Sequence, residues 1–340
     1  MSNPTADTKT YCNCLAEERG LAPQGHAGSF QDAVLIETPL PWKRGLFQEA
    51  NPLPQEMIDL LQRWLAHYQE TGEYGHRPLV IAPDEAYSHA GQRRVIFYTR
   101  PDGLFARYEK QEYLVPEEHV GALLEVWYGD QAALSDFDSY RVPDADAMRD
   151  ILVCTHGTVD VACAKFGYPL YKHLRDNHTD ESLRVWRVSH FGGHVFAPTL
   201  MDMPTGHYWG YLTEDAASQI MRRAGDVKAL SGHYRGWAGA QHGFQQAAEH
   251  ALWQIHSWDW FGTPRAAETI SQDDDTENPQ WADVRVRYLT PKTLNEHVHE
   301  VRVDVSHTVA TPPSTDHEKE YPYPQYRVRD GESEISQVAS

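Results

Sequence analysis

Four residues that bind soft or borderline metals lie in two pairs in the second half of the chain. Cys154 and Cys163 are separated by eight residues, and His190 and His194 are separated by three, within the stretch RVSHFGGHVFAP (187–198). Two thiolates and two imidazoles in one place describe a metal site. Such a set can hold one zinc ion tetrahedrally, or a [2Fe–2S] cluster with two cysteines on one iron and two histidines on the other.

Each pair follows a predicted β-strand. The apolar run ILV (151–153) leads directly into Cys154, and the alternating stretch LRVWRVSH (183–190) leads to His190. The segment 162–177 between them predicts a helix. In an open α/β sheet, the loops at the carboxyl ends of neighbouring parallel strands converge. We therefore expect the four side chains to meet, although 26 residues lie between Cys163 and His190.

The spacing within each pair bears on the kind of metal. Gly192 and Gly193 lie between the histidines and let the backbone come close to a bulky inorganic core. The wide gap between Cys154 and Cys163 favours a loop around a larger cofactor, because cysteines of zinc fingers are usually about two to four residues apart. Thiol chemistry by the two cysteines themselves is a third hypothesis, but redox pairs favour Cys-x-x-Cys. Ligand chemistry alone leaves zinc and the cluster both open.

Three further residues of the same chemical types lie near or outside this pattern. His156 lies between the two cysteines, whereas Cys12 and Cys14 lie near the N-terminus. We expect His156 to be a surface residue rather than a partner of the site. We expect Cys12 and Cys14 to be solvent-exposed, with no role in the site.

The bulk composition excludes several classes of function. The 340 residues carry a net charge of −19, which argues against nucleic-acid binding. This charge suits general solubility, and it would also favour a docking partner with a basic patch. Only four cysteines occur, which indicates a reducing compartment. We see neither a signal core nor about 18 consecutive apolar residues, so we expect a cytoplasmic protein without membrane contact. No glycine-rich dinucleotide fingerprint follows a strand, so we expect no bound NAD or flavin.

Hydrophobic periodicity predicts an α/β protein in several parts. The order β-α-β-β-β-α over 150–225 is that of a small thioredoxin-like unit, and the first half repeats this order loosely. Strong alternation of apolar and polar residues within 281–309 then predicts a β-hairpin. The predicted regions are a flexible lead-in (1–29), an N-terminal α/β domain of related architecture (30–140), a thioredoxin-like ferredoxin domain (150–262), a C-terminal β-hairpin extension (281–309) and a tail (310–340).

Three motifs resemble the sucrase/ferredoxin-like family, a branch of the thioredoxin-like [2Fe–2S] ferredoxins. They are CTHGTVDVAC, HFGGHVFAPTL and YWGYLTEDAASQIM. Ordinary members of the wider group carry Cys-x₃-Cys where this chain has His190 and His194. The resemblance is close over 150–260 and looser over 30–130, which looks like an extra α/β half without a cluster. It implies a [2Fe–2S] cluster with Cys154, Cys163, His190 and His194 as ligands.

The resemblance also implies a function. It indicates a one-electron carrier, or a component of a reductase, that exchanges electrons with an unidentified redox partner such as a flavoprotein reductase with a basic docking face. The alternative is a zinc-stabilised interaction module that uses the same four ligands. No pair of carboxylates lies in a context typical of glycosidases, so we expect no hydrolase site.

Overall fold

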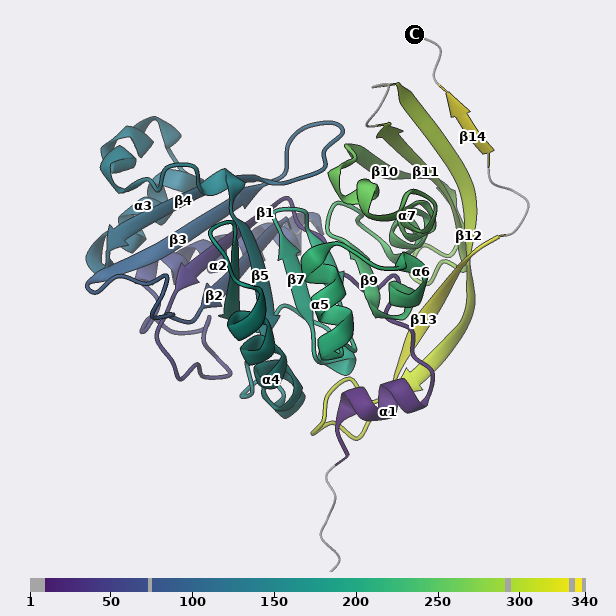
Figure 1. The fold of residues 1–340 in the computed structure, drawn as a ribbon, viewed down its shortest axis with the longest axis horizontal. Helices are drawn as coiled ribbons and strands as arrows, with labels where there is room; N and C mark the ends of the chain where they lie inside the picture. Colours follow the sequence, from purple (N-terminus) through teal and green to yellow (C-terminus); the bar gives the residue numbers. More distant parts are fainter. Residues whose placement is uncertain (1–9, 73–74, 291–294, 330–333, 338–340) are drawn as a thin grey trace, which may run out of the picture.

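Two β-sheets organise the chain (Figure 1). The computed structural model describes residues 10–72, 75–290, 295–329 and 334–337. The larger sheet has nine strands in the order β4-β3-β1-β2-β6-β5-β7-β8-β9, and the smaller sheet has five. Among the described residues, no helix is both long enough and apolar enough to cross a membrane.

The larger sheet is built from two halves with the same topology. In each half the first two strands pair in parallel, and the third strand pairs antiparallel with the first. The strand orders β2-β1-β3-β4 and β6-β5-β7-β8 are therefore equivalent, which confirms a thioredoxin-like unit and an N-terminal half of related architecture. The elements are β1 (Asp32–Glu37), α2 (Gln55–Thr71), β2 (His76–Ile81), β3 (Gln92–Thr99), β4 (Glu109–Pro116) and α3 (Val120–Tyr128), then β5 (Arg149–Cys154), α4 (Val161–His178), β6 (Leu183–Val188), β7 (Leu200–Met203), β8 (His207–Trp209) and α5 (Glu214–Arg222), with β9 (Tyr234–Trp237) added at the edge.

The two halves join edge to edge through β2 and β6. Ile81 and Val188 face each other in an antiparallel pair. Reciprocal backbone hydrogen bonds flank this pair, from Ala82 N to Arg187 O at 3.0 Å and from Ser189 N to Val80 O at 2.9 Å. The equivalent strand of each half meets its counterpart here, so the halves are related by an approximate twofold axis. The predicted domains 30–140 and 150–262 thus share one sheet.

A buried ionic network ties the two halves together. The fully buried carboxylate of Asp150 on β5 accepts hydrogen bonds from Arg184 Nε at 2.9 Å and from Lys110 Nζ at 2.5 Å. It also accepts one from Tyr98 Oη at 2.6 Å, and both Tyr98 and Lys110 belong to the N-terminal half. Burial alone raises the pKa of Asp150, but Arg184 and Lys110 outweigh burial and hold it well below its usual value.

Asp150→Asn is expected to lower the free energy of unfolding by about 3–5 kcal/mol, because it leaves buried cations without a countercharge. Since the folded pKa is depressed, the stabilisation by Asp150 is present above the unfolded pKa of about 3.9 and is lost as the pH falls below it. Chemical denaturation at neutral and acidic pH measures both effects. The control is Asp176→Asn, which removes an exposed ion pair with Lys172 and is expected to leave the stability almost unchanged. Equal stability of the two variants at neutral pH would contradict this account.

The C-terminal sheet confirms the predicted hairpin and corrects the predicted tail. β11 and β12 pair antiparallel, 281–289 with 296–304, within the predicted range 281–309. β13 pairs with β12 within the region predicted as tail. Its Pro322 and Pro324 are tolerated because, among the described strands, β13 has a partner on one side only. Of the tail, residues 330–333 and 338–340 lie outside the described residues. The strands are β10 (Arg265–Gln272), β11 (Trp281–Leu289), β12 (Glu296–Thr311), β13 (Tyr321–Val328) and β14 (Glu334–Gln337).

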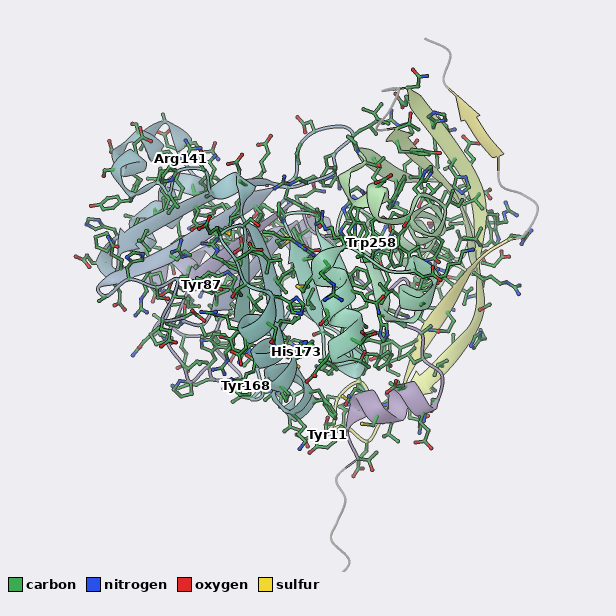
Figure 2. The ribbon with its side chains drawn as sticks, viewed as in Figure 1. Tyr11, Tyr87, Arg141, Tyr168, His173 and Trp258 are labelled. Atoms are coloured by element: carbon green, nitrogen blue, oxygen red, sulfur yellow. The ribbon has the colours of Figure 1, made fainter. Side chains whose placement is uncertain are left out.

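The predicted flexible lead-in contains a packed helix, α1 (Cys12–Glu18). Cys12 is 1 % exposed and Ala16 is fully buried, so one small apolar face of α1 contacts the rest of the protein. Tyr11, labelled in Figure 2, lies just before the helix. Its ring packs edge-on against that of Phe166 of α4, with 5.3 Å between ring centroids. Two turns are too short to show a periodic signal in the sequence. Residues 1–9 of the lead-in lie outside the described residues.

Candidate metal centre

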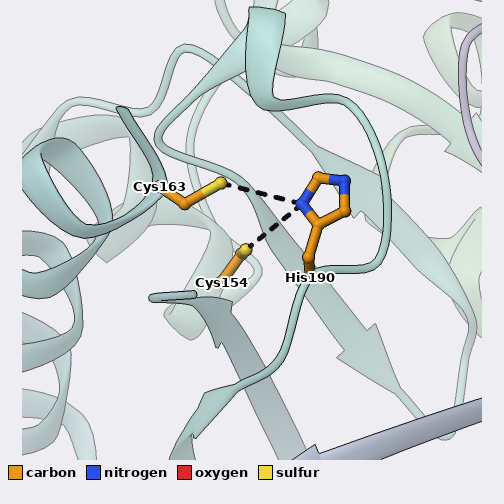
Figure 3. Close-up of side chains that lie close together, drawn as sticks. All are labelled: Cys154, Cys163 and His190. Atoms are coloured by element: carbon orange, nitrogen blue, oxygen red, sulfur yellow. Dashed lines mark hydrogen bonds between the residues drawn. The ribbon is translucent and has the colours of Figure 1, made fainter. Parts of the chain in front are cut away.

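Three of the four predicted ligands meet at the carboxyl end of β5 (Figure 3). Parallel pairing of β5 with β6 sets Cys154 opposite Val188, so the loop after β6 brings His190 to the same edge. The ligand atoms of Cys154, Cys163 and His190 all lie within 4.8 Å of one another. His190 Nδ1 is 3.9 Å from the Cys154 Sγ and 3.7 Å from the Cys163 Sγ. The predicted convergence of these strand ends therefore occurs.

Helix α4 positions Cys163 through its first turns. Asp160 caps the helix, and its carboxylate accepts a hydrogen bond from Ala162 N at 2.8 Å. Gly167 faces the end of β5, and a Cβ there would lie 2.0 Å from the Cys154 carbonyl oxygen. Pro169 lies inside the helix without ending it. A glycine at 167 thus allows α4 to pack directly on the strand that carries Cys154.

His194 lies beside this group without being part of it. Its ring stacks on His190 with 4.9 Å between centroids and 28° between planes. Its Nε2 donates a hydrogen bond to the carbonyl oxygen of Pro313, in the loop between β12 and β13. Its Nδ1 is buried and has no hydrogen-bond partner within the described part of the chain. With the proton fixed on Nε2, the lone pair of Nδ1 is free to bind a metal.

The protonation states suit metal binding. The pKa of Cys154 lies well below its usual value because Cys163 donates a hydrogen bond to its sulfur and because His190 is close. The pKa of Cys163 is raised, first by its hydrogen bond to Cys154 and then by burial. Burial lowers the pKa of His194, so its ring is neutral at neutral pH. A metal bound to both sulfurs would displace the proton that Cys163 donates to Cys154.

His156 supports the site and is not the surface residue predicted from the sequence. It is only 4 % exposed, and its Nε2 donates to the carbonyl of Lys43 at 3.1 Å. Its Nδ1 is then free to accept the backbone N–H of His190 at 3.3 Å. Lys43 belongs to the N-terminal half, so that half orients the loop of His190. The position of His156 between the two cysteines was the sequence signal for this role.

Two distant segments complete the surroundings. Thr315, near the C-terminus, donates from its backbone N and its Oγ1 to the Asp160 carboxylate, both at 2.7 Å. Cys12 Sγ lies 3.8 Å from Asp160 Oδ2 and 3.6 Å from the His194 carbonyl oxygen. Burial raises the pKa of Cys12 to about 11, so it acts as a thiol donor. The prediction of exposure is wrong for Cys12 and right for Cys14.

These features define an α/β protein with two thioredoxin-like halves, the second of which holds a buried cysteine–histidine group. The profile of the sucrase/ferredoxin-like family matches residues 23–236, more than half of the chain, and the protein therefore belongs to this family. No curated protein and no solved structure matches the chain. The matched range includes the four predicted ligands but neither Cys12 nor the loop with Pro313 and Thr315.

Proposed function

We propose that the protein is a one-electron carrier, or the electron-transfer component of a reductase, with a [2Fe–2S] cluster held by Cys154, Cys163, His190 and His194. The observation that carries the proposal is the buried Nδ1 of His194, which has no partner among the described residues. A buried polar atom without a partner is costly, and a metal would satisfy it. The residues therefore fit a group with two sulfur and two imidazole ligands.

The placement of His194 favours a cluster over a single ion. One tetrahedral zinc ion needs all four ligand atoms within about 2.0–2.3 Å of one point. The ligand atoms of Cys154, Cys163 and His190 form a compact group, within 4.8 Å of one another, and His194 lies outside it. In a cluster both histidines bind the second iron, so His190 and His194 are expected side by side, and their rings stack with 4.9 Å between centroids. The compact group of three is the observation that supports the alternative, a zinc-stabilised interaction module.

The residues of the chain orient the ligands and set their charge. The cluster, when bound, accepts and returns one electron, and two neutral imidazoles in place of thiolates raise its reduction potential. Pro313 holds the ring of His194 and its Nε2 proton. Thr315 holds Asp160 at the start of α4, and thereby Cys163. With a net charge of −19, the chain suits a redox partner with a basic docking face, such as a flavoprotein reductase.

A redox titration at several pH values tests the proposed function. We expect reversible uptake of one electron. We also expect the midpoint potential to fall with rising pH, over the range in which the ring N–H groups of the oxidised form lose their protons. The reduced centre is more negative and holds these protons more tightly, so each coupled proton lowers the potential by about 59 mV per pH unit. A potential that stays flat up to strongly alkaline pH excludes histidine ligands. Failure to take up an electron favours the zinc alternative.

A further inference from the structure

A cavity of about 400 Å³ adjoins the candidate metal centre on the side of His194. The chain has 49 acidic residues, yet none of the fourteen described residues that line this cavity is an aspartate or a glutamate. The lining instead includes Arg235, His26 and His242. An acid-free cavity in so acidic a chain provides a favourable environment for negative charge.

Arg235 brings a buried positive charge to this cavity. It is 3 % exposed, and it donates hydrogen bonds to two backbone carbonyls, that of Gly192 at 3.1 Å and that of His26 at 2.5 Å. Among the described residues, no carboxylate forms an ion pair with it, and its Nε has no hydrogen-bond partner. It packs tightly on the histidine loop, since a Cβ at Gly193 would lie 2.3 Å from Arg235 Nη2. A buried cation without a countercharge is unfavourable and attracts an anion.

A helix N-terminus reaches the same cavity. Helix α7 (Gly243–His256) has 14 residues, and its N-cap residue, His242, makes no capping hydrogen bond through its side chain. The backbone N–H groups of Gly243 and Phe244 have no acceptor among the described residues. Both His242 and Gly243 line the cavity. Free N–H groups and the helix dipole favour an anion at this end.

We propose that this cavity binds a small organic anion, with its carboxylate or phosphate group at the N-terminus of α7 near Arg235 and its body against Phe196 and Tyr323. Both aromatic residues line the cavity. The anion site itself does not depend on the proposed function. Only the effect of a bound anion on electron transfer rests on that function. Because His194 also lines the cavity, a bound anion disfavours the more negative, reduced centre. The two effects are thermodynamically linked. Reduction of the centre therefore weakens anion binding by the same factor by which the bound anion makes reduction less favourable.

Calorimetric titration of the intact protein at constant ionic strength tests the site. The probes are benzoate, phenyl phosphate, inorganic phosphate and benzamide, the neutral counterpart of benzoate. We expect at least one of the two organic anions to bind, and benzamide to bind at least tenfold more weakly than that anion. The preferred organic anion identifies the acidic group, and inorganic phosphate is expected to bind more weakly because it lacks an apolar body. Equal binding of benzoate and benzamide, or no binding of either organic anion, overturns the proposal.

Matched variants locate the binding. Arg235→Gln is expected to lower the affinity at least tenfold, whereas Arg222→Gln, the same change at an exposed residue of α5, leaves it unchanged. His242→Asp places a carboxylate at the N-cap, which caps α7 without disturbing the fold and is expected to abolish binding. His242→Asn supplies a cap without the charge and is expected to weaken binding less. Unchanged affinity in His242→Asp overturns the proposal even if Arg235→Gln fails to fold.

The visible spectrum separates this proposal from the proposed function. Loss of anion affinity in a variant that keeps the wild-type spectrum reports on the cavity alone. Anion binding by a protein that contains no iron leaves the anion site standing while the electron-transfer proposal fails. If the protein contains the cluster, the bound anion is expected to lower its reduction potential, by 59 mV for a tenfold difference in affinity between the two redox states.

Discussion

Cys154→Ala is expected to yield folded protein without iron, sulfide or visible absorption. Cys154 supplies a fully buried sulfur at the end of β5, and its pKa is already depressed toward the thiolate form that binds metal. Alanine keeps the strand but removes this proposed ligand, which leaves one thiolate where the proposed cluster needs two. Iron and sulfide analysis together with the visible spectrum measures the loss, and circular dichroism confirms the fold.

The matched control for this loss is Cys14→Ala, which makes the same change at an exposed cysteine and is expected to keep full iron content. Cys12→Ala is the more demanding comparison, because Cys12 is buried and its sulfur lies 3.6 Å from the His194 carbonyl oxygen. It is expected to keep the cluster, since Cys12 is held as a protonated thiol. Iron and colour retained in Cys154→Ala but lost in Cys12→Ala would show that the ligand assignment is wrong.

His194→Cys and His190→Cys are each expected to keep a cluster and to lower its reduction potential. A thiolate in place of a neutral imidazole adds one negative charge to the centre and stabilises the oxidised state. The structural change is expected to be larger in His194→Cys than in His190→Cys, because His194→Cys also removes the hydrogen bond to the carbonyl of Pro313. A redox titration of each variant beside the wild type measures the shift in reduction potential. The iron content shows how much of each variant carries a cluster.

His156→Gln serves as the control for these two variants. It removes an imidazole that contacts the backbone of His190 without being a proposed ligand. It is expected to keep the cluster with a smaller change in potential than either cysteine variant. If His194→Cys had the wild-type potential and full iron content, His194 would not be a ligand, and the compact group of Cys154, Cys163 and His190 would stand alone.

Much of the site could be predicted from the sequence because it depends on local order. An apolar run placed Cys154 after one strand and an alternating stretch placed His190 after another, and parallel pairing of those strands brings the two residues together. The contacts of Pro313 and Thr315 could not be predicted in this way. They depend on the pairing of β12 with β13, and the prolines of β13 prevented the prediction of that strand from the sequence.

The fold shows the same division between local and long-range signals. The repeated order of strands and helices indicated two related halves. The strand pairing at their junction comprises a single residue pair, Ile81 and Val188, which leaves no pattern in the sequence. Likewise Cys12 could not be placed, since α1 is short and its burial depends on surfaces formed by residues far away in the chain.

The measurement that tests the central claim most directly is a metal and sulfide analysis of anaerobically purified protein, with its visible spectrum. The account predicts a red-brown protein with iron and acid-labile sulfide in equal amounts, about two of each per chain, and no zinc. A colourless protein with about one zinc ion per chain and no sulfide would contradict it.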